Sequence, residues 1–61
     1  MTMIEVGQKR RAPSGLVFEV IVTDLDEKFA VVKELRLDGT WSLWPSEVVK
    51  FEEFEQYPLV E

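Results

Sequence analysis

Short apolar runs alternate with frequent turn residues along this chain, a pattern typical of a small β-rich domain. Residues 16–23, LVFEVIVT, give the clearest strand because Leu16, Phe18, Val20 and Val22 recur at every second position and share one face. Further strands are expected from the β-branched and aromatic composition of three segments: residues 4–12, 29–37 and 40–44. We therefore expect one all-β domain that spans residues 1–61.

The segment WPSEVVKFEEFEQY supports two interpretations. Pro45 suits the first position of a helical turn, so a short turn is expected at residues 45–48. Val49 and Phe51 then alternate as in a closing strand, and a fifth strand would protect the edges of the sheet. In the alternative, residues 47–55 form a short helix. We expect the turn followed by the strand.

The hairpin at Asp38-Gly39 decides which tryptophan is buried, because Asp-Gly favours a two-residue turn. In that register one face carries Leu35, Leu37, Thr40, Ser42 and Trp44. The other face carries Glu34, Arg36, Trp41 and Leu43. Because two charges are costly to bury, we expect Trp44 inside and Trp41 outside, with Arg36 lying over the indole ring. A looser turn would shift the register by one residue and exchange the faces.

The sequence LWPSEVV, residues 43–49, resembles the end of Src-homology-3 (SH3) domains, where similar residues lead through one helical turn into the fifth strand. The resemblance places Trp44 at a buried apolar position, Val49 at a buried valine, and Pro45 beside the ligand groove. Val48 stands where the family has its groove tyrosine, and the family's paired tryptophans are absent. The resemblance therefore implies a small five-stranded SH3-like barrel of the stand-alone bacterial or phage type, but not proline-rich peptide binding.

Charge and composition narrow the possible functions. Twelve acidic and seven basic residues give a net charge of −5, which argues against a general nucleic-acid binder. Histidine and cysteine are absent, so we expect no enzyme, no cofactor and no metal site. The acidic loop at residues 24–27 is interpreted as a solvated turn. Apolar runs such as residues 20–22 are too short for a signal peptide or membrane span, so we expect a cytoplasmic protein with no membrane partner.

The aromatic face of the hairpin is the best candidate functional surface, because exposed aromatic residues beside arginine are typical interface anchors. We expect a small non-enzymatic protein–protein interaction module, such as a phage-type adaptor or an inhibitor of a host protein. Its apolar contacts would be Trp41, Leu43 and Val48, with Arg36 and Glu34 as the polar rim. In an alternative, the same patch closes a homodimer.

A second hypothesis rests on the basic cluster Lys9, Arg10 and Arg11. On a strand, Lys9 and Arg11 share one face and Arg10 takes the other. Together with Trp41 they would supply the cations and the aromatic ring of a nucleic-acid platform. Three charges neutralise few phosphates, so nucleic-acid binding is the alternative rather than the leading interpretation. In the simplest interpretation, the cluster is a solvated first strand paired with nearby acids.

Overall fold

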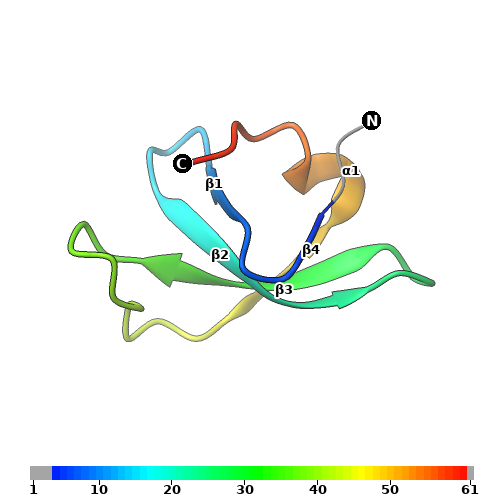
Figure 1. Ribbon diagram of the computed structural model, residues 1–61, viewed down its shortest axis with the longest axis horizontal. Helices are drawn as coiled ribbons and strands as arrows, with labels where there is room; N and C mark the ends of the chain where they lie inside the picture. The colour runs from blue at the N-terminus through cyan, green and yellow to red at the C-terminus, as the bar shows by residue number, and fades with distance from the viewer. Residues whose placement is uncertain (1–3, 61) are drawn as a thin grey trace.

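A computed structural model describes residues 4–60 and contains one antiparallel sheet with the strand order β1-β2-β3-β4 (Figure 1). The strands are β1 Lys9–Arg11, β2 Val17–Asp24, β3 Phe29–Leu35 and β4 Glu47–Lys50. The one-turn helix α1, Phe51–Phe54, follows β4 directly. The expected all-β class is therefore confirmed.

The two central strands, β2 and β3, pair from Val17 opposite Leu35 to Asp24 opposite Phe29. A bulge between Val20 and Val22 interrupts this register. Bulges bend a strand and increase its twist, and the ribbon curves accordingly, with α1 and the C-terminal segment, residues 55–60, on one side of it (Figure 1). The curvature lets a short sheet cover a core.

Residues 58–60 run antiparallel along the edge of β1. The Arg11 N–H donates to the Pro58 carbonyl at 3.0 Å, and the Val60 N–H donates to the Lys9 carbonyl at 2.9 Å. A bridge between Arg10 and Leu59 lies between these two hydrogen bonds. The C-terminal segment therefore covers the edge of β1 that β2 leaves open.

The core lies between the sheet, α1 and the C-terminal segment. Its buried members come from elements far apart in sequence: Ile4, Val20, Ala30, Val32 and Phe54. The Phe54 ring is fully enclosed and meets Tyr57 edge to face, with 5.6 Å between ring centroids. Aromatic pairs prefer this geometry, so Phe54 joins α1 to both the sheet and the C-terminal segment.

The last two regular elements occur in the reverse of the expected order. Strand β4 precedes the helical turn, whereas a turn at residues 45–48 followed by a strand was expected. Val48 and Val49 pair with Val31 and Ala30 of β3, and β-branched residues favour this extended pairing. The expected strand at residues 40–44 is also wrong, because regular β-pairing there is limited to one bridge between Trp41 and Leu35.

The turn after β3 is looser than a two-residue turn. The Gly39 N–H donates to the Arg36 carbonyl, and Gly39 has φ of 86°. The Arg36 N–H donates to the Thr40 carbonyl, so the loop has three residues and ends in a left-handed glycine. Leu35 consequently opposes Trp41 instead of Ser42, which is a shift of one residue.

Candidate functional site

Trp41 lies on the face of β2 and β3 that points away from the core. Its indole Nε1 donates a hydrogen bond of 3.1 Å to Oε1 of Glu19. The Lys33 ammonium nitrogen lies 5.5 Å from the ring centroid, within cation–π range. Glu19 and Lys33 oppose each other in the β2–β3 pairing, so two neighbouring strands hold the ring in one orientation.

The expected exposure of Trp41 is confirmed, since 50% of its surface is accessible. The expected contact with Arg36 is not observed, because the shifted register brings Lys33 to the ring instead. The expected burial of Trp44 is wrong: 69% of its surface is accessible. The chain bends after Ser42, whose hydroxyl accepts a hydrogen bond from the Trp44 N–H, so no strand carries Trp44 into the core.

The apolar surface extends from Trp41 across the same side of the sheet. Val31 and Lys33 point to one face of β3 because they are two residues apart. Val31 is flanked by Val22 on β2 and Val48 on β4, and both flanking valines are more than half exposed. We call Trp41, Lys33, Val31, Val22 and Val48 the outer face.

The segment between β3 and β4 adds further apolar side chains. Leu37, Leu43 and Trp44 are all largely exposed, and Leu43 retains 91% of its accessible surface. Trp44 also borders a hollow of about 320 Å³ that is lined by Phe18, Glu34, Pro45 and Glu47. Soluble monomers rarely expose so many large apolar residues together, so this loop and the outer face are candidates for a contact surface.

Of the residues expected to bind a partner, Trp41 and Val48 lie on the outer face, and Leu43 is exposed in the adjoining loop. The ring of Trp41 contacts Glu19 and Lys33, whereas Glu34 and Arg36 line a groove that begins at Leu35, opposite Trp41. Sequence reasoning missed Glu19 and Lys33 as the partners of the indole ring, because these contacts depend on strand register. It also missed Val22, whose alternation with Val20 ends at the bulge.

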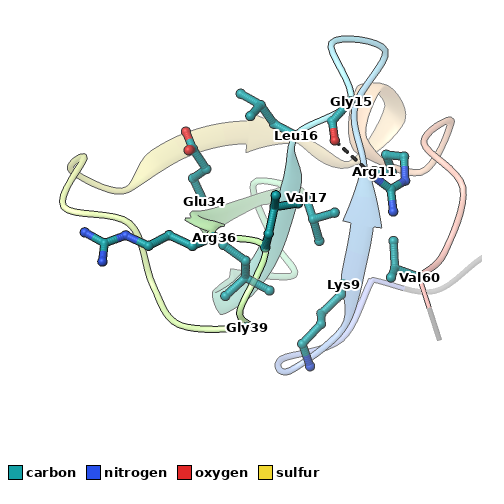
Figure 2. A pocket seen from close by; sticks show the side chains of 11 residues that line it. Lys9, Arg11, Gly15, Leu16, Val17, Glu34, Arg36, Gly39 and Val60 are labelled. Atoms are coloured by element: carbon teal, nitrogen blue, oxygen red, sulfur yellow. Dashed lines mark hydrogen bonds between the residues drawn. The ribbon is translucent and has the colours of Figure 1, made fainter.

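The groove is the second surface feature, and it has a volume of about 420 Å³. Figure 2 shows Lys9, Arg11 and Val60 on one side of it, with Glu34, Arg36 and Gly39 on the other side and Val17 between them. The remaining lining residues are Gly15, Leu16, Leu35 and Leu37. Nη1 of Arg11 donates to the Gly15 carbonyl at 3.0 Å, which ties this side chain to the neighbouring turn.

Arg10 lies on the opposite side of β1 and is buried, with 2% of its surface accessible. Its Nε donates to the Gln8 side-chain oxygen at 2.9 Å. Its Nη1 donates to the carbonyls of Glu55 and Tyr57 at 3.1 and 2.7 Å. Burial lowers the pKa of Arg10, and the nearby Glu55 charge partly opposes this effect.

The basic cluster expected to contact nucleic acid is therefore divided. Lys9 and Arg11 face the groove, as the alternation along a strand predicts, whereas Arg10 points into the interior. The expectation that Arg10 contributes to a surface platform is wrong, because its guanidinium already binds backbone carbonyls beneath α1. A solvated first strand is also wrong for this residue.

Among residues 4–60, no group of three or more acidic side chains is arranged to hold a metal ion. In the same described part of the chain, no helix has the length and apolar character needed to cross a membrane. No protein-family model, curated protein or solved structure matches this chain significantly.

Proposed function

We propose that this chain is a small non-enzymatic protein–protein interaction module that binds its partner through the outer face around Trp41. The observation that carries the proposal is a half-exposed indole ring held by Glu19 and Lys33. A ring that is already oriented loses little conformational freedom on binding. Tryptophan is also among the residues most enriched in binding hot spots.

The neighbouring side chains supply the rest of a typical interface. Val22 and Val48 extend the apolar contact area, and Leu43 can pack against a partner from the adjoining loop. Glu19 and Lys33 supply a charged rim, in place of the expected Glu34 and Arg36. An apolar centre with a polar rim is the usual arrangement of a protein interface.

We also propose that the sheet belongs to an SH3-like barrel whose fifth strand is residues 58–60. In this assignment β4 is the fourth strand and α1 is the single helical turn that precedes the fifth. Support comes from the two backbone hydrogen bonds between residues 58–60 and β1. We propose a cytoplasmic location for the module, as expected for an acidic chain without cysteine.

The test is a quantitative pull-down from a lysate of the source cells with wild type, Trp41→Ala and Leu25→Ala. Leu25 is a matched control because it is an exposed apolar residue in the turn between β2 and β3, away from Trp41. We expect Trp41→Ala to weaken capture of one protein at least about tenfold, and Leu25→Ala to leave it unchanged. Circular dichroism establishes that all three chains fold.

Nuclease treatment and dilution distinguish the competing interpretations. A protein contact survives nuclease, whereas capture that disappears with nuclease contradicts the proposal and favours nucleic-acid association. Light scattering on a dilution series detects a homodimer. Dissociation of such a dimer by Trp41→Ala would assign the outer face to self-association instead of a separate partner.

A further inference from the structure

We propose that the groove between β1 and the end of β3 is a second binding site, which takes an extended acidic peptide with aliphatic side chains. The groove adjoins the outer face at Leu35, which lies opposite Trp41, but the proposal does not depend on the function proposed there. Lys9 and Arg11 line one side of it, and Arg36 lines the other side with its side chain directed away from them (Figure 2). Within the described residues, Glu34 is the only acid in the lining. The groove therefore has the opposite charge to the chain, whose net charge is −5.

The spacing of Lys9 and Arg11 fits acidic side chains on an extended peptide. Both residues lie on one face of β1, two positions apart, which corresponds to about 7 Å along a strand. Carboxylates at alternate positions of an extended peptide have the same spacing. One Arg11 nitrogen is already bound to the Gly15 carbonyl, and the other N–H groups of a guanidinium can still pair with a carboxylate.

The rest of the groove is suited to aliphatic side chains. Val17 lies opposite both Arg11 and Leu35 in the sheet, so it forms the floor between the two walls. Leu37, which lines the groove, is fully exposed, and the Arg36 side chain extends away from Lys9 and Arg11 (Figure 2). A strand-like peptide directs alternate side chains to opposite sides, so carboxylates can face β1 while aliphatic groups face Leu37.

These features favour a peptide over nucleic acid. No aromatic side chain is among the described residues that line the groove, so bases would lack the stacking platform that single strands use. Trp44 borders a different hollow, and Trp41 lies beside the groove, opposite Leu35, without lining it. The acidic remainder of the chain also repels a polyanion of any length, whereas a peptide with a few carboxylates can remain within the groove.

The test is an NMR titration of ¹⁵N-labelled protein at low salt with the acetylated, amidated peptide Glu-Leu-Glu-Leu-Glu. We expect saturable shifts at the amides of Leu16, Val17 and Leu37, and none with the matched Gln-Leu-Gln-Leu-Gln peptide. The double variant Lys9→Gln/Arg11→Gln should weaken binding by about tenfold or more. The control Lys28→Gln/Lys50→Gln removes the same charge outside the groove and should change the Kd less than about twofold.

Three results would overturn the proposal: no saturable shifts, equal weakening in both double variants, or groove binding by a 12-nucleotide oligothymidine but not by the peptide. Arg11→Gln alone is the fallback if the double variant unfolds, because Arg11 is exposed. Trp41→Ala should leave peptide binding unchanged. A failure at the outer face can thereby be distinguished from a failure at the groove.

Discussion

Arg10 is enclosed beneath α1 and the C-terminal segment, whereas Trp44, in the loop between β3 and β4, faces solvent. Residue type alone would predict the reverse. Arg10 has partners: two of its hydrogen bonds go to the carbonyls of Glu55, the C-cap of α1, and of Tyr57 in the segment that follows. The last carbonyls of a helix lack partners within the helix, and buried Arg10 supplies a donor to the Glu55 carbonyl at this end of α1.

Trp44 has no comparable partners in the interior. The hairpin pairing that would have carried it inward stops at a single bridge between Trp41 and Leu35, and the chain then bends. The hydrophobicity of Trp44 favours its burial, but no strand directs its side chain into the core. The comparison between the Arg10 region and the Trp44 loop shows that backbone pairing, and not the hydrophobicity of the side chain, determines which of these residues is buried.

The largest effect on stability is expected from replacing an aromatic residue in each region, Phe54 in the core and Trp44 in the loop. Phe54→Ala should destabilise the protein by about 3–5 kcal/mol because it leaves a cavity in the core. That loss is about the whole stability of a domain of this size, so urea should reveal no cooperative unfolding transition. Trp44→Ala should change the free energy of unfolding by less than about 0.5 kcal/mol. Comparable losses in both variants would contradict the burial described for the two rings.

The next effect compares two arginines on opposite faces of β1. Arg10→Met keeps much of the apolar stem but removes the donors to Gln8, Glu55 and Tyr57. Buried acceptors without donors are costly, so we expect a loss of about 2–3 kcal/mol in urea unfolding. The matched variant Arg11→Met should cost less than about 0.5 kcal/mol, because Arg11 is exposed. A neutral Arg10→Met would show that the guanidinium contributes no net stability.

The same comparison shows how much of the fold can be read from local sequence. Residues 16–23 and 29–37 predict β2 and β3 to within two residues at each end, because alternation and β-branched residues are local signals. The order of β4 and α1 cannot be predicted from the local sequence. The run at residues 47–50 is compatible with a turn or a strand until β3 supplies a pairing partner.

Local sequence likewise predicts some features of the candidate site and not others. Trp41 is exposed as predicted, but that prediction used the charges of Glu34 and Arg36 and assumed a two-residue turn, whereas the observed register is shifted by one residue. The contacts of the ring with Glu19 and Lys33 require the register after Gly39. Asp-Gly is compatible with both two-residue and three-residue loops. Burial of Arg10 is even less accessible from the sequence, since its carbonyl partners lie 45 and 47 residues further along the chain.

A smaller effect is expected from the contact between the Trp41 ring and Lys33, which distinguishes Trp41 from the unanchored side chains of its loop. A double-mutant cycle with Trp41→Leu and Lys33→Met should give a coupling free energy of about 0.5–1 kcal/mol, as expected for an exposed cation–π pair. The parallel cycle with Trp41→Leu and Arg36→Met should give coupling near zero. Urea unfolding of the two cycles measures both values, and stronger coupling to Arg36 would favour the two-residue turn and its register.

The smallest effect concerns the turn that shapes the exposed loop. Asp38 has a lowered pKa because its carboxylate accepts hydrogen bonds from the hydroxyl and the N–H of Thr40 at 2.6 and 3.0 Å. The pKa of Asp38 is lower in the folded state than in the unfolded state. The ionised carboxylate therefore stabilises the folded state at pH values above the unfolded pKa, and this stabilisation is lost as the pH falls through the folded pKa.

Thr40→Val removes the largest cause of this shift and should raise the Asp38 pKa toward its ordinary value. A ¹³C NMR titration of the Asp38 carboxyl in both chains measures the difference. The backbone N–H of residue 40 remains in the variant, so a part of the shift should persist. An identical Asp38 pKa in the two chains would mean that the hydroxyl contact is not formed in solution, and that the three-residue loop depends on Gly39 and its backbone hydrogen bonds alone.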